Sequence, residues 1–413
     1  MQNIFIEQEY KFIPPIHWPF LTRWINRSGF FPWYLKRTAG VVQCEVTNES
    51  RLTESLRAGH GVLVTPNHPS TLDPLAMSYL SRKIDSCFYA MASWHLFHTS
   101  RFERWAVRLM GAFSVFREGL DRQAIDMAVR VLTEASRPLC IFPEGTATRT
   151  NDRLSEMLDG VSFIARTAAK KRAKDDPSKR VVVHPVAIKY LYLGKLEKEP
   201  QQLLEQIEKR LTFRPLEGVS YVERLRRVGE ALLSLKEIEY FGEVRGGEIA
   251  DRQNALVERL MAPLEEEWLG KVQTGGIVGR VKNVRMKVFP DIAKGAVDSQ
   301  ERARRYRHLA DTYLAQQIAF YPIGYFEEGV THERIVETIE RFEEDITDEA
   351  PTLGPLKVII DVLPAIEVEP QRDRHAESDA LMEQIKHALT SRLNELALLG
   401  TPYQFMPDGS SPA

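Results

Sequence analysis

The sequence predicts an α/β fold, in which a mostly parallel sheet carries helices on both faces and is interrupted by a large helical insertion. Two observations support this class. Between residues 41 and 195, apolar runs of strand length alternate with segments of helical periodicity. From 196 to 351, strand-like runs nearly disappear and amphipathic helical patterns follow one another, before strand character returns in 352–400.

The elements follow in order from the spacing of apolar residues. In the core, strands are expected at 41–46, 61–65, 86–92, 112–118, 138–141 and 180–192, with a turn at 142–146, and helices at 52–59, 75–83, 101–111, 124–136 and 161–173. In the insertion, helices are expected at 202–211, 221–235, 251–269, 303–321 and 333–346. A strand at 356–370 and a helix at 378–399 complete the core, and the tail 401–413 is expected to be disordered.

Length and composition limit the class of protein. A chain of 413 residues with 43% hydrophobic and 27% charged residues is ordinary for two or three globular domains, or for one domain with a large insertion. The net charge of −2 argues against a nucleic-acid partner. The cysteines, Cys44, Cys87 and Cys140, are odd in number and far apart, so we expect a reducing compartment and no disulfide framework.

The N-terminal arm, residues 1–40, has a distinct composition. Between 10 and 37 it carries basic residues, no acidic residue, and half of the six tryptophans. Mixed aromatic and basic side chains suit the headgroup layer of an anionic membrane. The alternative is a hydrophobic arm that packs on the neighbouring domain.

No stretch of the sequence is predicted to span a bilayer. The longest uncharged runs, such as 86–100, have 15 residues, fewer than the roughly 20 apolar residues that a spanning helix needs. No apolar segment of the secretory type follows Met1. We therefore expect a cytoplasmic protein, peripheral on the cytoplasmic face of a membrane.

The most informative stretch lies where the second predicted strand ends at Pro66. A polar turn follows and leads into a helix that Ser70 or Thr71 is expected to cap. His68 and Asp73 are five residues apart, about 500° around a helix, so they cannot share one helical face. His68 must then lie in the turn and fold back towards Asp73, as a base beside its orienting carboxylate, with no nucleophile of its own.

Polar residues follow other predicted strands as well. Arg117 ends the run that begins at Gly111, and Glu144 follows the strand that begins at Pro138. Sites in open α/β sheets form at the carboxyl ends of strands. We therefore expect His68, Arg117 and Glu144 to lie on one edge of the sheet.

These stretches, in this order, resemble the motifs of the glycerolipid acyltransferase family, which includes the lysophosphatidate acyltransferases. The matches are NHxxxxD at Asn67, His68 and Asp73, a glycine-to-arginine run at Gly111–Arg117, FPEGT at Phe142–Thr146, and a proline in an apolar strand at Pro185. A His/Asp pair at this spacing is common by chance, and the complete FPEGT behind it makes the match specific. The resemblance covers about residues 40–195, and a terminal strand and helix like 356–399 are usual in the family.

The resemblance implies an O-acyltransferase of phospholipid biosynthesis that moves a fatty acyl group from acyl-CoA or acyl carrier protein to the hydroxyl of a lysolipid. 1-Acyl-sn-glycerol-3-phosphate is the first candidate acceptor. His68 would take the hydroxyl proton, and Asp73 would fix the imidazole tautomer. No bound cofactor and no metal are implied.

The resemblance also assigns acceptor-binding residues, namely Arg117, Glu144, Gly145 and Thr146. Many relatives carry a basic residue directly after the threonine, where this chain has Ala147, and the next cation is Arg149. A lysolipid without a phosphate headgroup therefore stays open as an alternative acceptor. So does a catalytically inactive module that binds a membrane or a partner, whereas a serine hydrolase lacks its GxSxG motif here.

Charged runs in the insertion have simpler explanations. The basic stretches 280–287 and 302–307 could add attraction to a membrane, but solvated helix faces explain them as well. The acidic run 343–349 is expected to be solvated. Nothing in the sequence assigns a role or an oligomeric state to 196–351.

Overall fold

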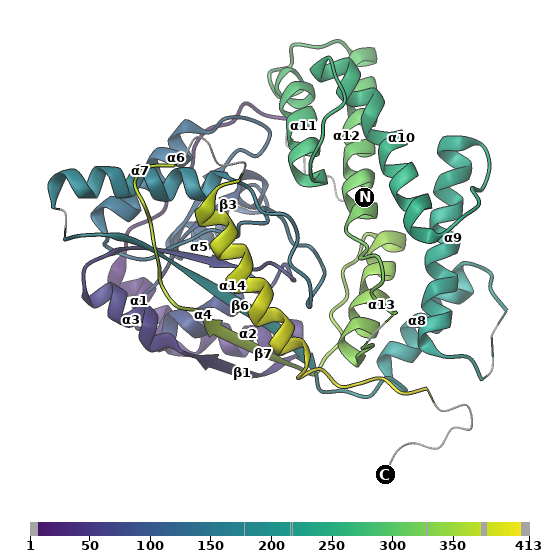
Figure 1. Ribbon diagram of the computed structural model, residues 1–413, viewed down its shortest axis with the longest axis horizontal. Helices are drawn as coiled ribbons and strands as arrows, with labels where there is room; N and C mark the ends of the chain where they lie inside the picture. The colour runs from purple at the N-terminus through teal and green to yellow at the C-terminus, as the bar shows by residue number, and fades with distance from the viewer. Residues whose placement is uncertain are drawn as a thin grey trace.

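The protein was studied as a computed structural model, which describes residues 7–176, 178–214, 216, 218–327, 329–372 and 378–405 (Figure 1). It has a sheet with helices on both faces and, beside it, a block of helices. The sheet order is β1-β7-β6-β2-β5-β3-β4, with β8 paired to β6. Its strands are β1 Val41–Thr47, β2 Gly61–Pro66, β3 Tyr89–Ser93, β4 Ala112–Val115, β5 Leu139–Cys140, β6 Val181–Tyr192, β7 Leu356–Val362 and β8 Ile366–Glu367.

The strands that were expected to carry the site run side by side. Strands β2, β3, β4 and β5 are joined by parallel pairings, and β2 also pairs in parallel with β6. Only β7 and β8 pair with β6 in the antiparallel sense within the described sheet. The predicted mostly parallel α/β fold is confirmed, and the carboxyl ends of β2 to β5 meet at one edge.

Helices cover both faces because each turns an apolar stripe to the sheet. One face carries α6 Arg122–Glu134, α7 Gly160–Asp175 and α14 Ala380–Ala397, and the other carries α2 Phe30–Ala39, α3 Glu49–Arg57 and α4 Asp73–Lys83. Strand β7 lies between β1 and β6, so a segment from near the end of the chain forms an internal strand, next to the edge strand β1. Helix α14 then packs on β6.

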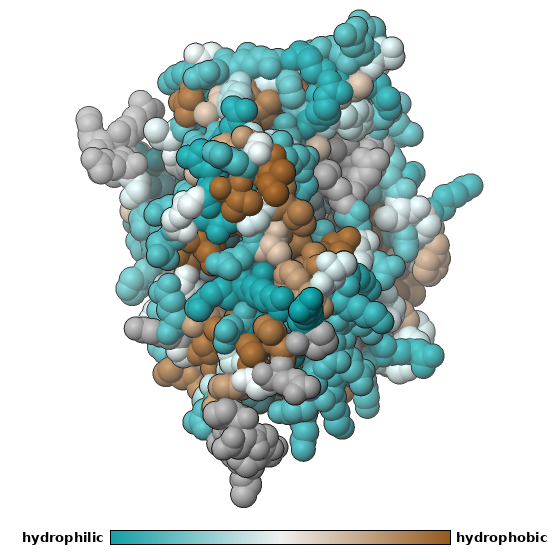
Figure 2. All heavy atoms as spheres, turned by 90° about the vertical axis from the view of Figure 1, so that its right-hand side faces the viewer, coloured by the Kyte–Doolittle hydropathy of each residue, from teal (hydrophilic) through white to brown (hydrophobic). Residues whose placement is uncertain are grey.

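The helical block follows β6 and precedes β7, and it lies to the right of the sheet in Figure 1. Its helices are α8 Glu199–Arg210, α9 Tyr221–Phe241, α10 Ile249–Leu269, α11 Ile277–Ala293, α12 Ser299–Ala319 and α13 His332–Thr347. One apolar cluster joins α9 to α12, and a second joins α8, α9 and α13 to the end of β6. The surface of this block that Figure 2 shows is mainly hydrophilic, with hydrophobic patches near its middle.

Helix α11 corrects the interpretation of the basic stretch 280–287. Arg280 is only 8% exposed, and its guanidinium pairs with Glu265 at 2.7 Å and with Glu258 at 2.5 Å. Val281 and Val284 are buried in the core of the block. The stretch is therefore packed on the side of Arg280, where two partner carboxylates compensate the buried charge, and the solvated face is limited to the side of Lys282 and Lys287.

The face of α13 that turns towards the sheet is acidic. Glu333, Glu337, Glu340 and Glu344 are spaced by four, three and four residues, so they share one side of the helix. They accept hydrogen bonds from the core: Tyr192 N donates to Glu333 at 3.0 Å, Asn151 N to Glu337 at 3.1 Å, and Leu353 N to Glu340. These carboxylates hold the insertion against the core.

The acidic run 343–349 begins on this packed helix. Glu343 is 6% exposed and pairs with Arg210, and Glu344 pairs with Arg149 at 2.7 Å. The prediction of a solvated run was wrong for these two residues. It holds for Asp345 and Glu349, which are exposed.

The acidic interface makes stability depend on pH. Burial raises the pKa of Glu337 from 4.5 to about 8 and that of Glu340 to about 7. In the unfolded chain these glutamates lose their protons above their ordinary pKa of 4.5, whereas in the folded protein they keep them up to about pH 7 or 8. Their contribution to the free energy of unfolding is therefore complete below about pH 4.5 and is lost as the pH rises through 7 and 8. We expect the melting temperature to fall as the pH rises through this window, and we expect this dependence on pH to be much weaker in the Glu337→Gln/Glu340→Gln variant. If the double variant showed the same dependence as a control with the exposed substitution Glu349→Gln, this assignment would be contradicted.

The N-terminal arm packs on the core along one side and leaves aromatic side chains exposed on the others. Its helices are α1 Pro19–Ser28 and α2 Phe30–Ala39. Phe31, Leu35 and Ala39 are buried against the core, as a packed arm requires. Aromatic side chains on the other sides stay exposed, Phe20 at 83% and Trp24 at 68%.

The described residues contain no helix that is long and apolar enough to cross a membrane. Most of the predicted disordered tail, 406–413, lies outside the described residues.

Candidate active site

The site begins where β2 ends. Asn67 is 1% exposed, and its side-chain amide spans to β6: Oδ1 accepts from Ile188 N at 2.7 Å and Nδ2 donates to Ile188 O at 3.0 Å. The amide replaces the ladder hydrogen bonds that β2 would have continued. The chain is thereby held to the sheet at the residue before His68.

His68 and Asp73 lie together, as their spacing predicts. His68 Nδ1 is 2.8 Å from Asp73 Oδ2. The Asp73 carboxylate is fully buried, and the His68 side chain is 13% exposed. Because an ionised carboxylate only accepts hydrogen bonds, Nδ1 carries the proton, and Nε2 is the nitrogen with a free lone pair.

Asp73 is itself the first residue of α4. It accepts from Ser70 N at 2.9 Å, and neither Ser70 nor Thr71 caps the helix, whose cap position is Leu72. The predicted capping role was wrong, because Ser70 Oγ accepts from the cap residue Leu72 N at 3.2 Å and from no N–H group inside the helix. The contact of Asp73 with Ser70 N closes the turn between the two members of the pair.

Tyr190 on β6 completes the surroundings of Asp73. Its hydroxyl donates to Asp73 Oδ1 at 2.8 Å. Burial and the nearby carboxylate raise the pKa of Tyr190 well above its ordinary value, so it stays a neutral donor. The two oxygens of Asp73 therefore meet donors from His68, Ser70 and Tyr190.

Removal of this donor should weaken the pair without abolishing it. A hydrogen bond to a charged group contributes about 1.5–3 kcal/mol. We expect Tyr190→Phe to lower the free energy of unfolding by about that amount and any activity that depends on His68 by about tenfold. Chemical denaturation and steady-state rates measure the two effects, and a variant unchanged in both would exclude a positioning role for Tyr190.

Glu144 lies beneath the same turn. It is 1% exposed, and its oxygens accept from His68 N at 2.6 Å and from Ser155 N at 2.8 Å. Burial raises the pKa of Glu144 to about 7. In this arrangement the carboxylate positions the main chain of His68, and the contact with an acceptor that the resemblance implies stays a prediction.

The turn that follows Glu144 is tightly built. Gly145 has a φ of +73°, and a Cβ there would lie 2.7 Å from Leu158 Cδ1, so only glycine fits without strain. Thr146 comes next and is half-buried. Thr148 N then donates to His68 O at 2.9 Å, which ties the two loops together. Phe142 stacks on the His68 ring with centroids 4.2 Å apart.

Arg117 lies at the same edge of the sheet but farther along it. It follows β4, which is separated from β2 by β5 and β3, and three strand spacings amount to about 14 Å. Its side chain is exposed and makes no hydrogen bond or ion pair with another described residue.

Arg149 is turned towards the insertion. Its guanidinium pairs with Glu344 of α13 at 2.7 Å. It also lines a cavity of about 80 Å³ together with Ser70, Glu337 and Glu340. The cation that the sequence offered in place of Ala147 is thus engaged in the interface between core and insertion, and its contact with an acceptor stays a prediction.

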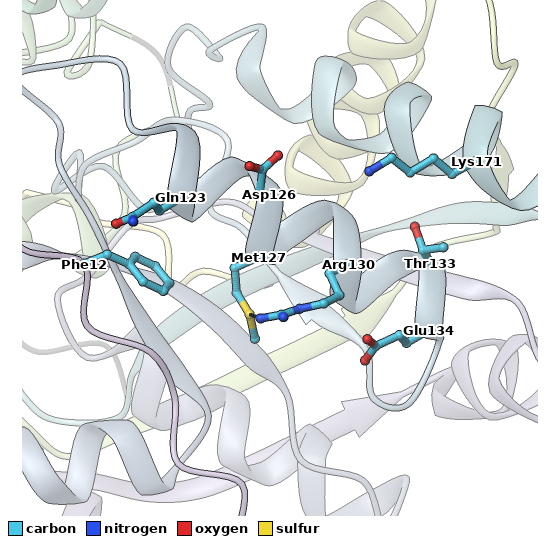
Figure 3. A pocket seen from close by; sticks show the side chains of 8 residues that line it. All are labelled: Phe12, Gln123, Asp126, Met127, Arg130, Thr133, Glu134 and Lys171. Atoms are coloured by element: carbon cyan, nitrogen blue, oxygen red, sulfur yellow. Dashed lines mark hydrogen bonds between the residues drawn. The ribbon is translucent and has the colours of Figure 1, made fainter.

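A second hollow lies elsewhere. It has a volume of about 660 Å³ and is formed by Phe12 of the arm, the outer side of α6 and Lys171 of α7 (Figure 3). Asp126, Arg130 and Glu134 mix both charge signs on its wall. None of the residues expected at the site lines it.

Sequence reasoning missed several residues of the site. Tyr190 and Ser155 carry no local signal, because their roles depend on contacts with Asp73 and Glu144 that only the fold creates. Asn67 and Phe142 belong to the motifs that the sequence showed, but their contacts did not follow from it. The structure shows that Asn67 holds the chain to β6 and that Phe142 stacks on the His68 ring.

Comparison with known proteins agrees with this geometry. A family model described as Acyltransferase matches residues 44–189, which contain His68, Asp73, Arg117 and Glu144. The 1-acyl-sn-glycerol-3-phosphate acyltransferase of Streptococcus pneumoniae is 34% identical over 107 residues, which cover 26% of this chain and 37% of the relative. The family match ends before the helical block begins. Residues 44–189 of this chain therefore form a domain of the acyltransferase family.

Proposed function

We propose that this protein transfers a fatty acyl group from a thioester to the hydroxyl of a lysolipid, with 1-acyl-sn-glycerol-3-phosphate as the acceptor, in phospholipid biosynthesis. The observation that carries the proposal is the His68–Asp73 pair, whose Nδ1 contact leaves Nε2 available as a base. The relative from Streptococcus pneumoniae bears the name of this activity and supports the choice of acceptor.

In the proposed reaction the acceptor supplies the nucleophile. His68 Nε2 takes the hydroxyl proton while the oxygen attacks the thioester carbonyl, and Asp73 stabilises the imidazolium that forms. The tetrahedral intermediate then expels the thiolate, which takes the proton from His68. Because the thiolate is a good leaving group, the protein needs no covalent intermediate of its own.

The acyl donor is proposed to be acyl-CoA or acyl carrier protein, and Arg117 is proposed to bind an acceptor phosphate. Its exposed guanidinium can donate two hydrogen bonds to neighbouring phosphate oxygens. Gly145 and Thr146 border the His68 loop and are proposed to contact the acceptor's glycerol backbone.

An acceptor panel tests the function. The purified protein is incubated with labelled acyl-CoA or acyl carrier protein and with lysolipids that carry a phosphate, a phosphodiester or no phosphate. Product with the phosphate monoester is expected. Product only with another headgroup would show that the acceptor is a different lysolipid. No product with any acceptor would favour an inactive binding module.

The substrates are membrane lipids, so we also propose that the protein binds the cytoplasmic face of a membrane through an aromatic surface on α1, α2 and α5 (Arg101–Leu109). Exposed side chains on this surface are Trp18, Phe20, Trp24, Phe30, Trp33, Phe102 and Trp105. Thr22 of α1 donates to Leu109 O at 3.1 Å, which joins the first and third of these helices. Since α5 follows β3 through the turn η1 Trp94–Phe97, it begins at the edge of the sheet where the site lies.

Vesicle binding should depend on these aromatic side chains. Burial of a large apolar side chain contributes about 1.5–3 kcal/mol, so Phe20→Ser/Trp24→Ser is expected to weaken binding to anionic vesicles at least about tenfold. Leu235→Ser, on α9 and 56% exposed, is the matched control. Equal binding by the double variant and the wild type in a sedimentation assay would exclude this surface.

A further inference from the structure

Helix α11 of the insertion reaches the loop that carries Arg117. The ring of Phe116 lies 6.1 Å from that of Phe289 on α11. Arg285 is four residues before Phe289, so both lie on one side of the helix, one turn apart. Arg285 Nε donates to Thr312 Oγ1 of α12 at 2.9 Å, which holds the side chain in place.

The two arginines share their surroundings with one carboxylate. The pKa of Arg285 is lowered to about 10, mainly by burial and also by Arg117, while Glu118 acts in the opposite direction. Burial raises the pKa of Glu118, and both arginines counteract this rise. His95, at the end of β3, is kept neutral because burial and Arg117 lower its pKa to about 4. The cluster of Arg117, Glu118, Arg285 and His95 therefore holds two guanidinium groups against one carboxyl group, beside a neutral histidine.

A further donor lies beside the cluster. Trp94 is 6% exposed, and its Nε1 has no hydrogen-bond partner among the described residues. Its ring meets Phe116 edge to face, with centroids 6.4 Å apart. An unpaired N–H in a buried place is costly, so this donor is suited to a ligand that only accepts hydrogen bonds.

We propose that Arg285 of the insertion forms, together with Arg117, the binding site for a phosphate monoester headgroup, and so determines which lysolipid the core acylates. This inference rests on the proposed function, because it assigns part of the acceptor site. It also gives the insertion a role, which is to supply a second cation beside Arg117. Ala147 carries no charge and Arg149 is paired with Glu344, so this cation comes from α11. Two guanidinium groups match the double charge of a phosphate monoester better than one.

Equilibrium binding tests the proposal without any acyl donor. The probes are a short-chain, monomeric 1-acylglycerol-3-phosphate and the monoacylglycerol with the same chain. Arg285→Gln is expected to weaken binding of the first about ten- to hundredfold and to leave the second unchanged. Lys287→Gln, exposed on the same helix, should change neither. Unchanged binding of the phosphate probe to Arg285→Gln, or an equal loss for both probes, would overturn the proposal.

A second variant covers the case in which Arg285→Gln does not fold. Glu118→Gln removes the carboxylate and leaves both arginines, so it is expected to tighten binding of the phosphate probe several-fold; unchanged or weaker binding would contradict the proposal. In turnover, Arg285→Gln should raise KM for the phosphate-bearing acceptor with little change in kcat. A protein that binds this acceptor through Arg285 and transfers no acyl group would refute the proposed function and leave the site standing.

Discussion

His68→Ala is expected to lower the rate of acyl transfer by about 10²–10⁴-fold, because a general base contributes about that much. The fold should survive the change. The His68 side chain is partly exposed, and Asp73 would keep its contacts with Ser70 N and Tyr190. Steady-state kinetics with saturating thioester measures the loss, and thermal melting within a few degrees of the wild type shows that the variant is folded.

The matched control is His387→Ala, which removes an exposed histidine from α14. It should retain wild-type activity. A folded His68→Ala protein with near-normal turnover would mean that another group accepts the proton, and the proposed mechanism would be abandoned.

Asp73→Asn is the second change with a large expected effect. An asparagine can donate to Nδ1 and so stabilise the wrong imidazole tautomer; the equivalent change in a serine-protease triad lowers kcat about 10⁴-fold. The fully buried side chain would also lose part of its hydrogen bonding with Ser70 N and Tyr190, at a cost of about 1–3 kcal/mol in the free energy of unfolding. Kinetics and chemical denaturation together separate the two effects.

The double variant distinguishes orientation from simple destabilisation. If Asp73 acts through His68, adding Asp73→Asn to His68→Ala should lower the rate little further, because residues that act as a unit are not additive. A multiplicative loss would indicate that Asp73 contributes to the reaction by an independent route.

The sequence was sufficient for the core because its signals are local. Strand-length apolar runs such as 61–65 and helical periodicity such as 124–136 became β2 and α6 with small shifts of their ends. The His68–Asp73 pair followed from spacing alone, since no regular helix could hold both residues.

Other features depend on partners that are distant in the sequence. The basic stretch 280–287 looked solvated because nothing local shows that Glu258 and Glu265 neutralise Arg280. Arg149 was predicted to contact an acceptor, and nothing local shows that its guanidinium also pairs with Glu344, almost two hundred residues later. The position of β7 between β1 and β6 likewise needs tertiary contacts that no periodicity reports.

This dependence on distant partners also explains why the sequence assigned no role to the insertion. Its helices were predicted by their apolar spacing, but α11 was not, because its charged residues conceal the buried stripe of Val281, Val284 and Val288. Without α11 the approach of Arg285 to the loop of Arg117 could not be anticipated. The structure therefore adds most where the resemblance to known acyltransferases ends.

The central claim is that His68 activates a hydroxyl that the acceptor brings, and its most direct test is the dependence of thiol release on acceptor. Free thiol is measured from an acyl thioester with and without 1-acylglycerol-3-phosphate, at enzyme concentrations high enough to detect one turnover. The proposed mechanism predicts thiol release only with the acceptor, equal in amount to the acylated lipid and lost in His68→Ala. A burst of thiol stoichiometric with enzyme in the absence of acceptor would show an acyl-enzyme and contradict it.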